Sequence, residues 1–383
     1  MPLVSSVIRR LRWIQRRPSL KQSANLLRNI RGYLLHSQQA APLPSLVKID
    51  ISPLCSLACP HCVHGNPAGR DRPLLSDQKF GKQDKLSLQQ YQHIIDQIKD
   101  RALGVSLFYY GDPLAHPDLT DMIRATTAAG LESHITTHFS YRLKAERIHD
   151  LVDAGLSHIT ISVDGATQES FQVTRVRGRL DFVLNNLRLL AGYKKRKGLK
   201  SPFIEIQHIS FPHHAEDELV QVKAIVDEIG IDAFTTFEGL RFDANGDLYN
   251  VVDDDPDRIE NGPPLSSSLT PRCHWPHSST VIRFDGDVIP CCLWRSGRQY
   301  VSDKNRDPHV LGNVFDEPLE TIWNNEKYKA LRWQVWNPRA HSKREAAASF
   351  CDGCPRLYEK PGREPSLRHE VDIEFAEKKA LGS

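Results

Sequence analysis

Apolar and polar positions follow two different periods along residues 46–240. Short apolar runs, typical of buried strands, alternate with segments whose apolar residues recur at the three- and four-residue spacing of helices. The predicted strands are residues 46–51, 105–110, 134–138, 158–164, 203–211 and 233–240. The predicted helices are residues 88–99, 119–129, 143–154, 180–195 and 216–229. Strands that alternate with helices predict a parallel α/β fold, either a doubly wound sheet or a barrel.

The segments on either side of this alternation have other patterns. Residues 4–35 predict two short helices divided by Pro18, and residues 253–272 are acidic and then rich in Pro and Ser, which is typical of a connector. A second group of cysteines follows, with short strands and one predicted helix, residues 319–333. We therefore expect basic helices (1–45), a main α/β domain (46–244), a connector (245–272), a cysteine-containing domain (273–355) and a charged, partly ordered tail (356–383).

Charge is distributed unevenly along the chain. Of the 383 residues, 40% are hydrophobic and 25% are charged, which is typical of a globular protein. The net charge is +3, but residues 1–49 contain nine Lys or Arg and no Asp or Glu, so the rest of the chain carries −6. We expect this basic segment either to pack against the main domain or to lie on an anionic membrane surface with its arginines outward. A mitochondrial transit peptide is the alternative.

Other targeting and partner classes lack a signal in the sequence. No apolar run approaches the roughly 20 residues that cross a bilayer, and there is no signal-peptide pattern. The basic segment has few interleaved aromatic residues, Trp13 and Tyr33, so a nucleic-acid partner is not expected. The eight cysteines fall into spaced groups, which favours metal ligation in a reducing cytoplasm over disulfides.

Three of these cysteines follow the first predicted strand directly. Cys55, Cys59 and Cys62 have the spacing Cys-x3-Cys-x2-Cys, which allows three thiolates to surround one face of a [4Fe–4S] cluster. Such a cluster normally takes four cysteine ligands, so three leave one iron open. An open metal position indicates chemistry, whereas a complete shell indicates structure or electron transfer. The alternative is a zinc site completed by His61 or His64.

With this loop, residues 46–355 resemble the radical S-adenosylmethionine (SAM) superfamily. The resemblance implies a partial (β/α)6 barrel of the TIM type, with its active site at the carboxyl ends of the strands. His61 stands where the family usually has an aromatic residue. The resemblance also implies that the three-cysteine cluster binds SAM and reductively cleaves it to a 5′-deoxyadenosyl radical, which abstracts hydrogen from a C–H bond of the substrate.

Further strand ends resemble motifs of the same family. Tyr110-Gly111-Asp112-Pro113 resembles a Gly-Gly-Glu-Pro segment that holds the methionine amino group, with a carboxylate one methylene shorter. Thr136-Thr137-His138 resembles a Thr-Asn-Gly segment near the ribose, and Ser162-Val163-Asp164-Gly165 matches Ser-x-Asp-Gly. An arginine that follows often meets the methionine carboxylate, for which a guanidinium fork is suited. The resemblance therefore implies these SAM-binding residues: Gly111, Asp112, Thr137, His138, Ser162, Asp164, Arg175 and Arg177.

The second cysteine group resembles the SPASM extension of that family, in the shortened form called a twitch domain. Gly286 begins a Gly-x4-Cys pattern that ends at Cys291, in a predicted hairpin. The resemblance implies one auxiliary [4Fe–4S] cluster on four cysteines, Cys273, Cys291, Cys351 and Cys354. A structural zinc site is the alternative. Cys292 is expected on the opposite strand face from Cys291, as a small buried residue or as a catalytic hydrogen-atom donor.

The resemblance leaves the substrate class open. Residues 1–45 are short for a leader-peptide recognition domain, which favours a small molecule such as a carbohydrate or polyol in natural-product biosynthesis, undergoing oxidation or epimerisation. The alternative is a maturase that epimerises or cross-links a ribosomally made peptide. A second alternative is a non-catalytic iron–sulfur electron carrier. A flavodoxin- or ferredoxin-type protein is expected as reductant.

Overall fold

A computed structural model describes residues 14–59, 62, 80–211, 213–238, 273–291, 310–338, 351 and 372–375. Within these ranges ten strands form one sheet, in the order β10-β6-β5-β4-β3-β2-β1-β7-β8-β9. The strands that the sequence predicted are β1 (Leu46–Ile49), β2 (Gly104–Ser106), β3 (Glu132–Thr137), β4 (His158–Ser162), β5 (Phe203–Ser210) and β6 (Ala233–Glu238). All neighbours from β1 to β6 pair in parallel. The sheet curves without closing, which confirms the partial barrel.

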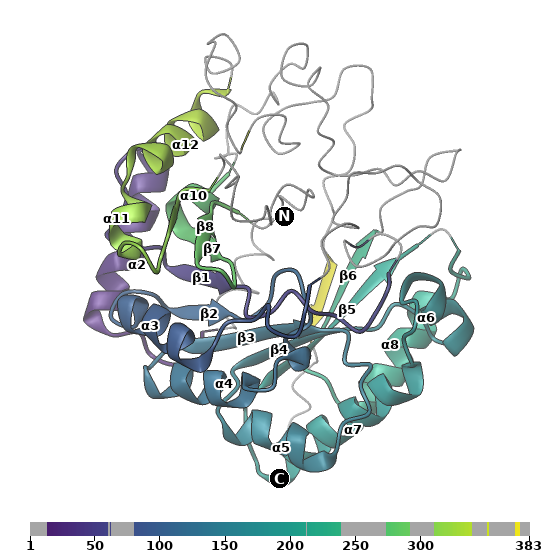
Figure 1. Cartoon of the computed structure of the whole chain (residues 1–383). Helices are drawn as coiled ribbons and strands as arrows, with labels where there is room; N and C mark the ends of the chain where they lie inside the picture. The colour runs from purple at the N-terminus through teal and green to yellow at the C-terminus, as the bar shows by residue number, and fades with distance from the viewer. Residues whose placement is uncertain are drawn as a thin grey trace, which may run out of the picture.

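Helices cover one face of this sheet (Figure 1). They are α3 (Leu88–Ile98), α4 (Leu119–Ala128), α5 (Ala145–Asp153), α6 (Gln168–Thr174), α7 (Leu180–Arg196) and α8 (Glu218–Ile229). The short α6 was not predicted, and each of the other helices begins and ends within two residues of the expected bounds. The local signals are plain in α3, where Ser87 and Gln90 form a capping box and the buried side chains recur at helical spacing.

The cysteine-containing region continues the same sheet beyond β1. Strand β7 (Ser279–Ile282) pairs in parallel with β1, and β8 (Asp287–Ile289) and β9 (Gly312–Asn313) add antiparallel strands. The predicted glycine turn lies between β7 and β8, where Gly286 has φ +88°. A side chain on Gly286 would also overlap the Phe315 ring. The hairpin is therefore confirmed, whereas its parallel pairing with β1 was not predicted.

Two expectations about this region need correction. The single helix predicted at residues 319–333 is two helices, α11 (Leu319–Trp323) and α12 (Glu326–Trp336). The break occurs because the Asn325 side chain accepts a hydrogen bond from the Tyr328 amide and caps a new helix. The charged tail contributes a strand that was not predicted, β10 (Asp372–Phe375), which pairs antiparallel with β6. A short helix, α10 (Trp275–Ser278), precedes β7.

The basic N-terminal region contributes one described helix, α2 (Leu20–Leu34), which begins at the Ser19 capping box after Pro18. The first predicted helix lies largely outside the described residues. Helix α2 packs against the protein through its polar side, with Gln22, Asn25 and Asn29 buried, so the packing that the sequence predicted for this segment is present. No helix in the described ranges is both long and apolar enough to cross a membrane.

Candidate active site

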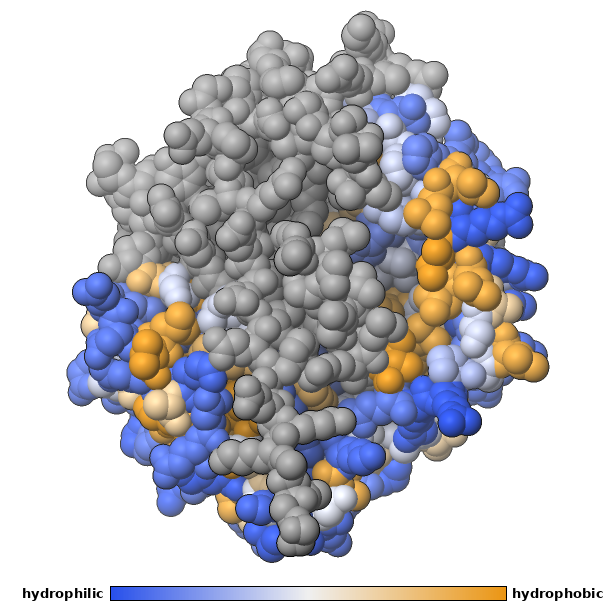
Figure 2. Space-filling view, turned by 180° about the vertical axis from the view of Figure 1, so that it is seen from behind, coloured by the Kyte–Doolittle hydropathy of each residue, from blue (hydrophilic) through white to orange (hydrophobic). Residues whose placement is uncertain are grey.

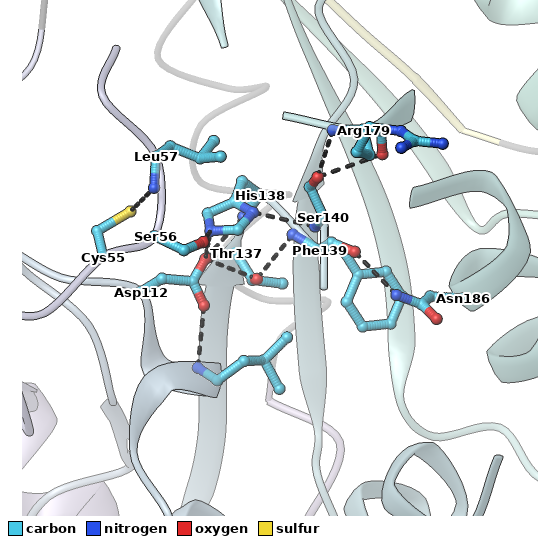
Figure 3. Close-up of polar contacts among 11 residues, drawn as sticks. Cys55, Ser56, Leu57, Asp112, Thr137, His138, Phe139, Ser140, Arg179 and Asn186 are labelled. Atoms are coloured by element: carbon cyan, nitrogen blue, oxygen red, sulfur yellow. Dashed lines mark hydrogen bonds and ion pairs between the residues drawn. The ribbon is translucent and has the colours of Figure 1, made fainter. Parts of the chain in front are cut away.

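The three clustered cysteines lie in the loop that follows β1. The Cys62 amide donates to the Cys59 carbonyl at 3.0 Å, which turns the loop back on itself. The Leu57 amide points at the Cys55 sulfur, 3.5 Å away (Figure 3). All three thiols are free of disulfides. The loop therefore presents three sulfur ligands from one short segment.

The strand predicted at residues 105–110 ends earlier, at Ser106, and the segment that follows it lies directly against this loop. The Asp112 amide donates to the Leu54 carbonyl at 2.8 Å. At Gly111 an added Cβ would lie 2.2 Å from the Ser52 oxygen and 2.4 Å from the Leu54 oxygen, both in the backbone. Glycine is therefore required here because the two backbones approach more closely than any side chain allows.

The Asp112 carboxylate joins the segment after β2 to the end of β3. One oxygen accepts from the Leu114 amide at 2.9 Å. The other accepts from the Thr137 hydroxyl at 2.8 Å and from the His138 amide at 2.9 Å (Figure 3). The side chain is almost fully buried. Three donors thus hold the Asp112 carboxylate, and through them Asp112 positions the end of β3. Its role in binding SAM stays a prediction.

The His138 imidazole extends from this network toward the cysteine loop. Its Nδ1 accepts from the Ser140 amide at 3.0 Å, which places the proton on Nε2. Nε2 lies 3.3 Å from the Ser56 hydroxyl and 3.4 Å from Asp112, and the ring stacks on Tyr141. Burial lowers the pKa of His138, and the Asp112 charge opposes that shift. A neutral imidazole therefore links the end of β3 to the residue beside Cys55.

The segment from Thr137 to Tyr141 is held in an unusual conformation. Phe139 has φ +55°, and its amide donates to the Thr137 hydroxyl at 2.9 Å. The Asn186 side chain of α7 donates to the carbonyls of Phe139 and Tyr141. A non-glycine residue with positive φ persists only where its surroundings fix it. The sequence analysis missed Ser56, Tyr141 and Asn186. Ser56 and Tyr141 could have been found because they lie next to the predicted motifs, and Asn186 because it is a polar residue on the buried side of a helix.

A buried ion pair supports the other side of the loop. Arg175 Nε donates to Asp164 at 2.6 Å, and the Ile209 amide donates to the second Asp164 oxygen at 2.8 Å. Burial raises the pKa of the Cys59 thiol, and the neighbouring Arg175 opposes this rise. The Ala58 amide also donates to the Val176 carbonyl at 3.1 Å. Arg175 therefore contacts both Asp164 and a cysteine of the cluster loop.

The remaining predicted residues differ in their placement. Ser162 is buried at the end of β4. Arg177 is exposed and has φ +71°. The structure thus brings Asp112, Thr137, His138, Asp164 and Arg175 to the cysteine loop, while the Arg177 side chain faces solvent. The roles of all these residues toward SAM stay predictions.

The donor set fits an iron–sulfur cluster. Burial raises the pKa of the Cys55 thiol, and Asp112 and the thiols of Cys62 and Cys59 raise it further. A metal that ligates the thiolate form offsets the free-energy cost of deprotonating a buried thiol. No three His, Cys, Asp or Glu side chains in the described ranges meet closely enough to bind a single metal ion. A cluster differs from a single ion in that each cysteine ligates a different iron.

The auxiliary cysteines are described only in part. Cys273 and Cys351 both pack around Val335 of α12, together with Trp336. Cys291, just beyond β8, packs against the main core. Cys292 and Cys354 lie outside the described residues, so the predicted opposite orientation of Cys292 is untested. The structure therefore brings together two of the four predicted auxiliary ligands.

Removing the Asp164 charge is expected to destabilise this region. Asp164→Asn would leave the Arg175 guanidinium buried without its counter-charge, at a cost of about 3 kcal/mol in the free energy of unfolding. The change should appear as a lower denaturant midpoint and weaker iron loading. The matched control is Asp181→Asn, which removes an exposed partner of Arg179 and should change stability by less than about 1 kcal/mol. Equal midpoints for both variants would contradict the proposed importance of the buried pair.

Comparison with known sequences identifies the class. The sequence model of the radical SAM superfamily matches residues 49–223, and that of the SPASM iron–sulfur cluster-binding domain matches residues 273–355. The chain belongs to the radical SAM superfamily and carries a SPASM domain. It is a radical SAM enzyme whose cofactors are a [4Fe–4S] cluster and SAM. The SPASM domain implies auxiliary iron–sulfur clusters as well.

Its relatives have several activities. The chain is 23% identical to an AdoMet-dependent heme synthase of Methanosarcina barkeri, over 76% of this chain and 85% of that protein. It is 29% identical to a PqqA peptide cyclase of Bradyrhizobium diazoefficiens, over 33% of this chain and 30% of the cyclase. The solved structure of Streptococcus suis SuiB bound to the precursor peptide SuiA has the same fold, with a TM-score of 0.55 and 15% identity over 83% of this chain and 74% of SuiB.

Proposed function

We propose that this radical SAM enzyme abstracts a hydrogen atom from a C–H bond of a peptide, leading to epimerisation or a cross-link. The observation that carries the radical chemistry is the three-cysteine loop, enclosed by the segment after β2, by the end of β3 and by the Arg175 segment. The support for a peptide comes from the PqqA peptide cyclases among the relatives. This replaces the carbohydrate-like substrate that we expected from the short N-terminal region.

The residues around the loop position and enclose the cofactors. When bound, the cluster and SAM supply the radical that removes hydrogen from the substrate. Gly111 allows the backbone before Cys55 to lie against β2, and Asp112 fixes the end of β3 at the same place. Arg175 places a positive charge beside Cys59, which stabilises the thiolate form that a cluster needs. The chain's own side chains thus position the loop from two sides.

The SPASM domain implies auxiliary iron–sulfur binding in addition to the catalytic cluster. We propose one auxiliary [4Fe–4S] cluster on Cys273, Cys291, Cys351 and Cys354. The packing of Cys273 and Cys351 around Val335 supports part of this ligand set. The reductant that we propose is a flavodoxin- or ferredoxin-type protein of the cytoplasm. A non-catalytic electron carrier is not retained, because the superfamily is enzymatic.

The substrate class can be tested before the substrate is identified. The reconstituted, reduced enzyme is incubated with SAM and a small-molecule-and-peptide extract from host cells grown in deuterated medium. Hydrogen abstraction transfers deuterium to 5′-deoxyadenosine, which mass spectrometry detects. Treating the extract with protease beforehand should remove the deuterium transfer if the substrate is a peptide.

The controls separate the possible outcomes. Heat-inactivated protease should leave the transfer intact, and periodate oxidation of polyols should leave it largely unchanged. Transfer that survives protease and is lost after periodate would contradict the peptide proposal and restore the carbohydrate alternative. Formation of 5′-deoxyadenosine with no deuterium from any extract would contradict hydrogen abstraction from a substrate in that extract.

A further inference from the structure

Helix α2 is fixed to the protein by the side that a surface helix normally exposes. Its buried residues are Gln22, Asn25, Asn29 and Gly32. Three of its four leucines face solvent: Leu20 is 90% exposed, Leu27 65% and Leu34 60%, whereas Leu26 is partly buried. A surface helix of a globular protein normally buries its apolar stripe and exposes its polar side. The orientation of α2 is therefore reversed.

Specific hydrogen bonds hold this reversed orientation. The Asn25 and Asn29 side chains both donate to the Leu43 carbonyl at 2.9 Å, and Asn29 also donates to the Ser45 hydroxyl at 2.9 Å. The Gln22 side chain donates to the Ala102 carbonyl at 2.8 Å. Rotating α2 to bury its leucines would leave these buried carbonyls and amides without partners, which is costly. These hydrogen bonds therefore keep the apolar side of α2 facing outward.

The exposed apolar residues form one continuous stripe. Leu20, Leu27 and Leu34 are spaced seven residues apart and so lie in a line along the helix, with Ile30 between them and Leu35 beyond its end. Figure 2 shows a hydrophobic stripe, bordered by hydrophilic residues, on the side of the molecule where Figure 1 places α2. Isolated exposed leucines are ordinary, whereas a contiguous stripe marks an interaction surface.

The charge beside the stripe is positive. Arg28 and Arg31 are exposed on α2, Lys21 pairs with Asp100 at 3.2 Å, and residues 1–49 contain no acidic residue. The rest of the chain has a net charge of −6, so the basic N-terminal segment and the remainder of the chain have net charges of opposite sign. An apolar stripe with basic residues along its border matches a bilayer surface, where leucines enter the acyl boundary and guanidinium groups meet lipid phosphates.

We propose that α2 is an interfacial anchor that holds the enzyme on an anionic membrane surface. Two features favour a bilayer over a second copy of the chain. A two-fold interface would place Arg28 and Arg31 of each copy near those of the other, and like charges repel. The stripe is also a single convex helix side, which suits insertion into a deformable lipid layer. The proposal concerns location and does not depend on the identity of the substrate.

The test is vesicle co-sedimentation of the full reconstituted chain. One set of vesicles contains phosphatidylcholine alone and the other contains phosphatidylcholine with phosphatidylglycerol. We expect binding to the anionic vesicles that weakens as salt rises, and little binding to the neutral ones. The double variant Leu27→Gln/Leu34→Gln should bind the anionic vesicles at least about tenfold more weakly.

A matched control uses exposed apolar residues elsewhere. Leu219 and Val220 of α8 are 37% and 68% exposed, and Leu219→Gln/Val220→Gln should bind like the wild type. Both variants should retain the wild-type circular dichroism spectrum and iron content, because the changes are on the surface. Wild-type protein that ignores anionic vesicles, or an α2 variant that binds them as tightly as the wild type, would overturn the proposal. Light scattering that shows a dimer abolished by the α2 variant would also overturn it, in favour of self-association.

Discussion

Replacing Cys55, Cys59 and Cys62 together with alanine is expected to abolish formation of 5′-deoxyadenosine. The three thiols come from one loop, and no other group of three cysteines in the sequence has this spacing. Without them the catalytic cluster has no ligands in the barrel, so the rate should fall to that of a protein-free control. Liquid chromatography with mass spectrometry measures the product after anaerobic reconstitution with dithionite and SAM.

The iron content of the same variant is its internal control. Two [4Fe–4S] clusters give about eight irons per chain, and the triple variant should keep about four, in the SPASM domain. Its retained iron would show that the loss of product does not come from unfolding. A triple variant that cleaves SAM at the wild-type rate would contradict the assignment of the catalytic cluster. Wild-type protein with about four irons and one tightly bound zinc would instead favour the structural zinc site.

Gly111→Ala is expected to have the second-largest effect. A Cβ at this position would lie 2.2 Å from the Ser52 oxygen, 2.4 Å from the Leu54 oxygen and 2.7 Å from the Leu54 nitrogen. All three atoms belong to the backbone just before Cys55, so the cysteine loop itself must move. Small displacements of reacting groups lower the reaction rate strongly, so we expect SAM cleavage to slow by about a hundredfold. Overpacking should also lower the free energy of unfolding by about 1–3 kcal/mol.

Gly192→Ala is the matched control for this prediction. Gly192 lies within α7, and its added Cβ would meet only the terminal nitrogen of Arg196, at 3.4 Å. A flexible side chain can move aside, so this variant should keep its activity and gain about 0.5–1 kcal/mol from the better helix propensity of alanine. The prediction fails if Gly111→Ala retains wild-type cleavage, or if both glycine variants lose activity equally.

The local pattern was sufficient to predict the strands of the barrel and its helices other than the short α6. Strands β1 to β6 and helices such as α3 have strong periodicity and clear caps, so short-range signals determine them. The cysteine loop and the strand-end residues Asp112 and Asp164 were found because parallel strands bring their carboxyl ends together. Their hydrogen-bond partners were not predictable, since the bonds from Thr137 and His138 to Asp112 depend on how the segment after β2 lies against the end of β3.

Features that depend on long-range packing escaped the sequence analysis. The pairing of β7 with β1 joins segments more than two hundred residues apart, and no local signal specifies it. Helix α2 was predicted from its period, but the period does not say which side is buried. The side is decided by Asn25 and Asn29, whose amides reach the Leu43 carbonyl. A polar side chain with a buried partner can thus outweigh an apolar stripe.

The most direct test of the central claim is SAM cleavage by the wild-type chain. The protein is reconstituted anaerobically with iron and sulfide, reduced, and given SAM. Our account predicts that 5′-deoxyadenosine and methionine form together in equal amounts, and only when reductant is present. A protein that is loaded with iron–sulfur clusters and reduced, yet forms no 5′-deoxyadenosine, would contradict the assignment of this chain as a radical SAM enzyme.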